Sequence, residues 1–205
     1  MLTLIQTHLQ SIYRIEAPDI RQFVIDEEQL REIAGEDIRN ADEWVLARPT
    51  DGGLDLAVYI AAPHLDDLQR VSSLPEAADR CFRAFCSATE GVSHFLMLVD
   101  RARRNEPVTL LELEAQAEVD KFVSARLHHP LRTSEWWDRL FRDARLSEGL
   151  DAEEVHRYQE AGRLAASFCS TLDELPHVDA LLRLLRRFWR DSGTQRLDRM
   201  RRLAA

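Results

Sequence analysis

Hydrophobic residues recur at helical spacing along most of the chain, and the pattern is strongest between residues 82 and 123. From residue 82 to residue 103 apolar side chains return every three or four positions, and residues 95–99 are apolar without a break. A helix that is apolar on nearly all sides usually lies in the centre of its domain. A second helix should begin near Thr109, which fits a capping box with Glu112. Because the connection is short, we expect two antiparallel central helices.

A different period marks the region from residue 43 to residue 61. Hydrophobic and polar residues alternate there on both sides of a Gly-rich turn, as in half-buried strands, which predicts a β-hairpin. Two strands alone are marginal in water, so we expect residues 20–26 to add a third strand. The sequence therefore predicts a predominantly helical α+β fold, in which a small N-terminal antiparallel sheet packs with a C-terminal bundle of several helices.

The composition of the chain changes once, near residue 77, after which it is helical throughout. We therefore divide the chain into an α+β subdomain, residues 1–76, and a helical subdomain, residues 77–205, and expect them to form one continuous compact unit. Thr3 and Gln6 fit a capping box for the first helix. Further amphipathic helices are predicted at residues 3–14, 27–34, 152–172 and 178–191, with an arginine-rich helix after residue 193.

Four ionisable residues fall within the predicted central helix pair. Glu90 and His94 are one turn apart on the first helix, and Glu118 lies on the apolar stripe of the second. Lys121, the only lysine in the chain, follows Glu118 by three residues. A buried carboxylate without a partner costs on the order of several kcal/mol, so His94 and Lys121 are the natural partners of the two glutamates.

Two interpretations of these residues are open. Glu90, His94 and Glu118 could form a metal or acid/base cluster. They could instead form a buried polar network that fixes the register of the helices, with Glu118 and Lys121 as an ordinary helical pair. Carboxylate and imidazole groups at helical spacing arise easily by chance, so the second interpretation is favoured, and we predict neither a metal nor another cofactor.

Other polar motifs carry less chemical information. Residues 153–156 match the Glu-x-x-His element of di-iron proteins, but no second copy is present, and acidic residues are common in a first helical turn. His128 and His129 are expected in an exposed connection. Gly162 belongs to a stripe of small residues, which we expect to allow another helix to approach closely. The three cysteines lack CxxC spacing and indicate reduced thiols without a catalytic role.

Charge is distributed unevenly along the chain. The net charge is −9, but residues 183–205 contain eight arginines and two aspartates, and this basic tail leaves −15 for residues 1–182. The tail could dock on the acidic body or bind an acidic partner. Its candidate binding residues are Arg186, Arg187, Arg190 and Arg199.

The absence of familiar motifs shapes the functional prediction. The sequence contains no nucleotide-binding glycine loop, nucleophile elbow or zinc-ligand pattern, and no apolar run approaches the roughly 20 residues of a membrane span. We expect a cytoplasmic binding, adaptor or regulatory module with a protein partner, and an enzyme is the less favoured hypothesis. The alternative is a hydrolase-like enzyme, metal-assisted or acid/base, that uses the Glu/His cluster. The acidic body argues against nucleic acid as a partner.

Overall fold

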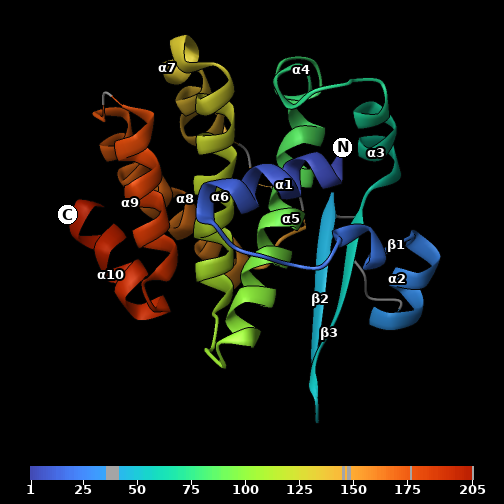
Figure 1. The fold of residues 1–205 in the computed structure, drawn as a ribbon. Coiled ribbons are helices and arrows are strands. Elements are labelled where there is room, and N and C mark those ends of the chain that lie inside the picture. Colours follow the sequence, from blue (N-terminus) through green and yellow to red (C-terminus); the bar gives the residue numbers. More distant parts are fainter. Residues whose placement is uncertain (36–41, 145, 147–148, 176, 205) are drawn as a thin grey trace.

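A long central helix, α5 (Phe82–Arg103), organises the fold in the computed structural model (Figure 1). The structure describes residues 1–35, 42–144, 146, 149–175 and 177–204. Helix α5 has the sheet on one side and α6 (Leu110–His128) on the other, and the side chains of its middle are almost all buried. The capping box of Thr109 with Glu112 begins α6, as predicted. The prediction of two neighbouring central helices is confirmed, and the fold is predominantly helical α+β.

The sheet has three strands in the order β1-β3-β2. Strands β2 (Glu43–Thr50) and β3 (Gly53–Ile60) form the predicted hairpin, and β1 (Val24–Ile25) lies within the predicted third strand. The sheet is mixed, however, because β1 pairs parallel to β3, with Val24 opposite Val58. The segment containing α2 (Glu27–Ala34) leaves and re-enters the sheet at the same end. This path makes β1 parallel to β3, so the expectation of a purely antiparallel sheet was wrong.

Helix α1 (Leu2–Tyr13) crosses over α5 and α6 (Figure 1) and buries Leu9, Ile12 and Tyr13. The predicted capping box of Thr3 with Gln6 is not formed. Gln6 is buried instead, donates a hydrogen bond of 2.7 Å to the Pro18 carbonyl and accepts one of 3.0 Å from the Ile20 amide. The glutamine therefore fixes the chain that follows α1.

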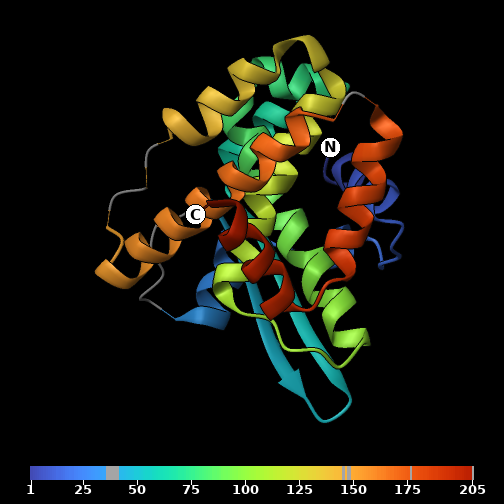
Figure 2. The same cartoon turned by 90° about the vertical axis from the view of Figure 1, so that its left-hand side faces the viewer.

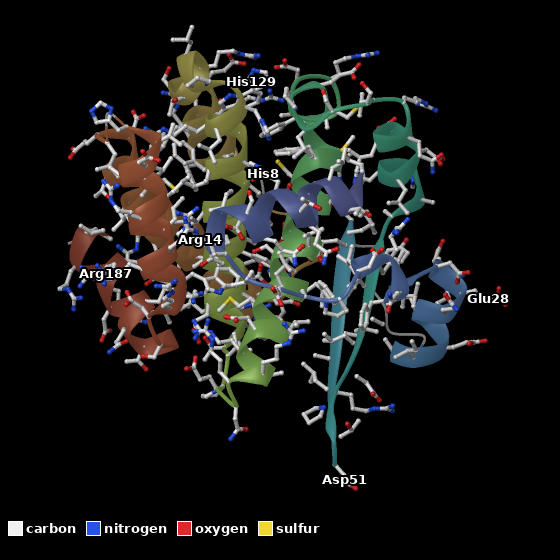
Figure 3. All side chains as sticks on the ribbon, in the orientation of Figure 1. His8, Arg14, Glu28, Asp51, His129 and Arg187 are labelled. Carbon is white, nitrogen blue, oxygen red and sulfur yellow. The ribbon has the colours of Figure 1, made fainter. Side chains whose placement is uncertain are left out.

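The remaining helices surround this centre. Helices α8, α9 and α10 make an outer layer beside α6 and α1 (Figure 2), and the hairpin tip at Asp51 projects away from the body (Figure 3). The basic tail is docked, since Leu197 and Met200 are buried. In the described part of the chain, no helix combines the length and apolar character needed to cross a membrane. The described residues also form α3 (Ala62–Gln69), α4 (Leu74–Arg80), α7 (Thr133–Trp137), a π-helical turn (Asp138–Arg142), α8 (Ala152–Asp173), α9 (Val178–Arg190) and α10 (Gly193–Ala204). Short 3₁₀ helices lie at Ile20–Gln22 and Pro130–Arg132.

Two further expectations are corrected. His128 ends α6 and its ring lies 4.7 Å from the ring of His8, while Nε2 of His129 is 3.2 Å from the Pro75 carbonyl oxygen. These histidines are therefore partly buried contacts between elements rather than an exposed connection. Gly162 has no close neighbour, because a Cβ atom at this position would meet nothing within 4 Å. It does not mediate a close helix contact.

Candidate functional site

The four polar residues predicted on the central helices converge in the structure. Glu90 and His94 project from successive turns of α5 toward α6, from which Glu118 and Lys121 project. The Lys121 ammonium lies 2.6 Å from Oε2 of Glu90 and 2.7 Å from Oε1 of Glu118. Lys121 therefore joins a carboxylate of each helix.

Two more glutamates, which the sequence reasoning did not select, complete the cluster. Glu114 lies one turn before Glu118 on α6, and its Oε2 is 3.8 Å from Nε2 of His94. Glu43 enters from the start of β2, with Oε1 3.9 Å from Nδ1 of His94. The imidazole is thus placed between carboxylates of two different elements. We call Glu43, Glu90, His94, Glu114, Glu118 and Lys121 the Glu/His centre.

A glycine on α5 brings the sheet close enough for Glu43 to take part. A Cβ atom on Gly91 would lie 2.8 Å from Cδ1 of Ile60 and 3.4 Å from Oε2 of Glu43. Any larger residue would force these side chains to move. This glycine, next to Glu90 in the sequence, was the signal that could have pointed to a strand packed against the site.

Carboxyl groups are crowded within the Glu/His centre, and this shifts their pKa values. Burial raises the pKa of Glu114 to about 8, and the negative charge of Glu90 adds to the increase. Burial also raises the pKa of Glu43, again with help from Glu90. For Glu90 itself, burial acts to raise the pKa, but the charges of Lys121 and His94 together with hydrogen bonds to the carboxylate outweigh burial, and the pKa is lowered. The carboxyl groups therefore differ in how readily they ionise.

The pKa values of the His94 imidazole and the Lys121 ammonium group are shifted in opposite directions. Burial lowers the pKa of His94, although the charge of Glu90 opposes the change. Burial also acts to lower the pKa of Lys121, but the charges of Glu118 and Glu90 dominate and raise it. At neutral pH His94 is therefore a neutral imidazole, which is the form that can act as a metal ligand.

Helix α8 closes the outer side of the centre. Nε of Arg157 is 4.0 Å from Oε1 of Glu114, and burial together with the charge of Glu114 raises the pKa of the adjacent Tyr158. The four glutamates thus face two permanent cations, Lys121 and Arg157. Burial raises the pKa of Cys86, which neighbours Lys121, to about 12, so this thiol is not activated as a nucleophile.

Some polar atoms of the centre have no hydrogen-bond partner. His94 is only 6% exposed, yet its Nε2 has no partner among the described residues, and the same holds for the buried Oε2 of Glu43. One ligand atom from each of Glu90, His94 and Glu114 lies within 4.8 Å of the other two. The side chains of Glu90 and Glu118 remain 18% and 23% exposed, so the edge of the centre reaches solvent.

The remaining candidate residues lie elsewhere. Arg186, Arg187 and Arg190 line a pocket beside α9, whereas Arg199 pairs with Asp191 at 2.7 Å and does not line it. The Glu-x-x-His element at residues 153–156 begins α8, where His156 is exposed and a capping box is formed, so it does not belong to the Glu/His centre.

Comparison with known proteins finds no matching family model, no similar curated protein and no similar solved structure. The functional inferences below therefore depend on the residues and their geometry.

Proposed function

We propose that the Glu/His centre binds a divalent transition-metal ion through Glu90, His94 and Glu114, and that the protein is a metal-dependent enzyme of the hydrolase type. The observation that carries the proposal is the close approach of three ligand atoms, all within 4.8 Å, with Nε2 of His94 lacking a partner. Ligands on opposite sides of a metal ion lie about 4 to 4.6 Å apart, because each bond is about 2.0 to 2.3 Å long. Small side-chain adjustments would suffice for binding.

The ligand types favour particular metals. One imidazole with two carboxylates is a mixed nitrogen and oxygen set, which suits Mn²⁺, Fe²⁺ or Zn²⁺ better than Ca²⁺ or Mg²⁺. Metal binding would also favour the ionised forms of Glu43 and Glu114, whose pKa values burial raises. These considerations support a single transition-metal ion between α5 and α6.

The other residues of the centre have distinct roles in this proposal. A bound metal ion supplies acidity to a coordinated water molecule. Glu43, whose Oε2 is buried and has no hydrogen-bond partner among the described residues, would act as the general base. Lys121 positions Glu90 through the 2.6 Å contact, and its positive charge favours the ionised form of the Glu90 carboxyl group. The partly exposed Glu90 and Glu118 mark the side from which a substrate would enter.

Metal binding can be tested on protein stripped with a chelator and titrated with Mn²⁺, Fe²⁺ or Zn²⁺ in a calorimeter. We expect one ion per chain and an increase in thermal stability. The Glu114→Gln variant should lose affinity by about 100-fold or more, because it removes a ligand while keeping the shape of the side chain. The metal-loaded protein should hydrolyse a panel of activated esters and phosphoesters, and this activity should be lost in Glu43→Gln.

The matched variant is Glu118→Gln, which removes the same charge one turn away but leaves the three proposed ligands intact. It should bind metal within about tenfold of the unmodified protein. Wild-type affinity in Glu114→Gln, or equal losses in the two variants, would contradict the proposed ligand set. Circular dichroism of each variant checks that the fold is retained.

The sequence favours a non-catalytic binding module, and this hypothesis stays a prediction. The pocket lined by Arg186, Arg187 and Arg190 is the part of the molecule that supports it. A binding role for this surface is compatible with a metal-dependent centre, since the two involve different residues.

A further inference from the structure

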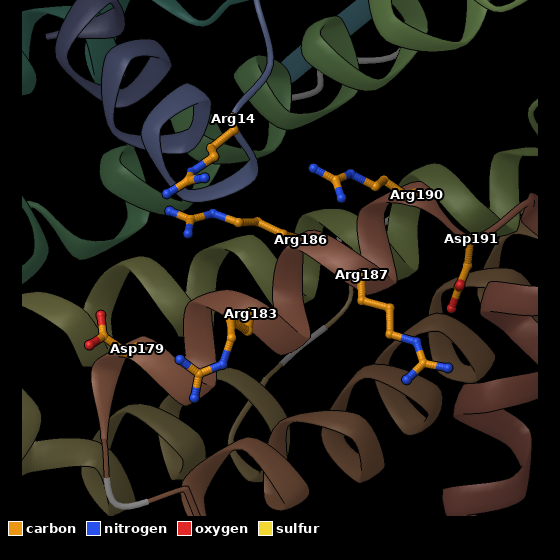
Figure 4. Close-up of a pocket in the computed structure, with 7 residues that line it drawn as sticks. All are labelled: Arg14, Asp179, Arg183, Arg186, Arg187, Arg190 and Asp191. Atoms are coloured by element: carbon orange, nitrogen blue, oxygen red, sulfur yellow. The ribbon is translucent and has the colours of Figure 1, made fainter.

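Five arginines surround a pocket of about 580 Å³ between the end of α1 and helix α9 (Figure 4). On one edge of α9 the guanidinium groups of Arg14 and Arg186 lie side by side and Arg190 points toward them, while Arg183 and Arg187 project from the other edge. Asp179 and Asp191 are the acidic residues that also line it. We call this surface the basic pocket. Its two sets of guanidinium groups flank the exposed face of the helix.

We propose that the basic pocket binds a small ligand that carries two or more phosphate groups. The arrangement offers one cationic subsite on each edge of α9. Guanidinium groups bind phosphate oxygens through paired, charge-assisted hydrogen bonds, which makes arginine well suited to this ligand class.

The positive charge of the pocket is not neutralised from within. The carboxylate of Asp191 is bound by Arg199, at 2.7 Å, and no ion pair joins Asp179 to the pocket arginines among the described residues. The pKa of Arg186 is lowered, first by burial and then by the charges of Arg14 and Arg190. Mutual repulsion of this kind is relieved when an anion binds.

One subsite is preorganised by the end of helix α1. Arg186 donates hydrogen bonds to the carbonyl oxygens of Ile12, at 2.8 Å, and Ser11, at 3.3 Å, which fixes its guanidinium group at that helix end. Arg14 ends the same helix in the left-handed conformation, with φ of 55°. Ligand binding would therefore not have to order both of these side chains, which lowers the entropic cost of binding.

The size of the pocket and the charge around it favour a compact ligand over a polymer. A volume of about 580 Å³ is within the range of small-molecule sites. Residues 1–182 carry −15, so a long polyanion that extended beyond the pocket would meet an acidic surface. A small phosphorylated molecule can bind among the five arginines of the pocket without extending beyond it.

The experiment titrates the full chain with inorganic triphosphate and, separately, with orthophosphate. It uses the Glu114→Gln variant with a chelator present, so that metal held at the Glu/His centre cannot contribute. We expect triphosphate to bind at least about tenfold more tightly than orthophosphate, because it can occupy both subsites. Raising the salt from about 50 to about 200 mM should weaken binding.

The decisive comparison uses two double variants of equal charge. Arg187→Gln with Arg190→Gln removes one guanidinium from each edge, and neither side chain makes a hydrogen bond or ion pair within the described structure. It should weaken triphosphate binding at least about tenfold. Arg201→Gln with Arg202→Gln, on the exposed face of α10, should change it less than about twofold.

Equal losses in the two double variants would overturn the proposal, because the attraction would then be a diffuse property of the basic tail. Failure of triphosphate to bind would also overturn it. Tighter binding of a single-stranded oligonucleotide, or of vesicles containing anionic lipid, would replace the small ligand with a polymer or a membrane surface. None of these outcomes bears on metal binding, so the two proposals can fail independently.

Discussion

At the scale of single residues, two buried polar groups between the central helices differ in how completely they are hydrogen-bonded. Asp120 accepts hydrogen bonds from Tyr13, from Ser93 at 2.6 Å and from Gln116 at 2.9 Å. Burial raises its pKa to about 6, but its oxygens are well supplied with donors. His94 has an unpartnered Nε2. The unpartnered Nε2 of His94 belongs to a residue whose ligand atom lies within 4.8 Å of those of Glu90 and Glu114, and this combination is the better sign of a ligand site.

His8 should make the stability of the protein depend on pH. Burial and the neighbouring His128 lower its pKa from 6.5 to about 4. Between these two pH values, His8 is therefore protonated in the unfolded chain but neutral in the folded chain. Stability is therefore unaffected above pH 6.5 and falls as the pH decreases toward 4. In His8→Phe, which keeps an aromatic ring against His128, this dependence should be reduced by roughly 1 to 2 kcal/mol at about pH 5.

Urea denaturation of both proteins at neutral pH and at about pH 5 measures the difference. Measurements above pH 6.5 provide the control, since the difference in stability between the two proteins should not change with pH there. If His8→Phe and the unmodified protein lost stability in parallel, the pairing of His8 with His128 would not be the cause.

At the scale of elements, the sequence predicted the helix boundaries better than their environment. The pattern identified α5 as central and predicted the range of α8, and a capping signal located the start of α6. It did not predict that α6 is also buried on nearly all sides, because this helix carries many polar residues. Glu114, Gln116, Asp120 and Lys121 have partners on other elements, which no local pattern reports. The buried polar residues of α6 are Glu112, Glu114, Gln116, Asp120, Lys121 and Ser124.

The candidate site was predictable to the extent that it is local. Glu90 with His94, and Glu118 with Lys121, are separated by one turn, so the helical period brings each pair together. Glu43 lies 47 positions before Glu90 in the sequence and reaches the site only because the sheet packs against α5. Contacts of this kind depend on tertiary structure, and hydrophobic periodicity cannot specify them.

Two glycine-to-alanine substitutions in helices should change stability in opposite directions. A Cβ atom on Gly193, at the start of α10, would lie 2.2 Å from Oε1 of Glu112. Glu112 is buried, and its carboxylate holds the capping box of α6 through 3.0 Å bonds to Thr109. Displacing it in Gly193→Ala should cost about 1 to 2 kcal/mol. Gly162→Ala, in open space on α8, should stabilise by about 0.5 to 1 kcal/mol.

Both variants can be compared by urea denaturation with a common slope. The same chemical change is made in each, so helix propensity alone would stabilise both. Destabilisation of Gly162→Ala would show that the space beside this position on α8 is not open. Stabilisation of Gly193→Ala would show that the packing of α10 against Glu112 is not as described.

At the scale of the whole molecule, hydrogen bonds join the first helix of the chain to helices much later in the sequence. Tyr13 donates its hydroxyl hydrogen bond to Asp120, and Arg186 caps the end of α1. Trp189 stacks on Tyr13, and Arg101 of α5 donates to the carbonyl oxygens of Trp189, at 3.1 Å, and Asp191, at 2.8 Å. These bonds join residues that are far apart in the sequence, and several of them cross the boundary predicted near residue 77.

These contacts predict that residues 1–76 and 77–205 unfold together, in a single cooperative transition. Differential scanning calorimetry should give an enthalpy of about 140 kcal/mol near 60 °C for a 205-residue chain, equal to the van't Hoff enthalpy. Removing the first subdomain would expose the sheet-facing side of α5 and deprive Asp120 of the Tyr13 hydroxyl, so the remainder should not fold alone. A van't Hoff enthalpy well below the calorimetric value, or a cooperatively folded fragment 77–205, would instead make the change in composition near residue 77 a true boundary between folding units.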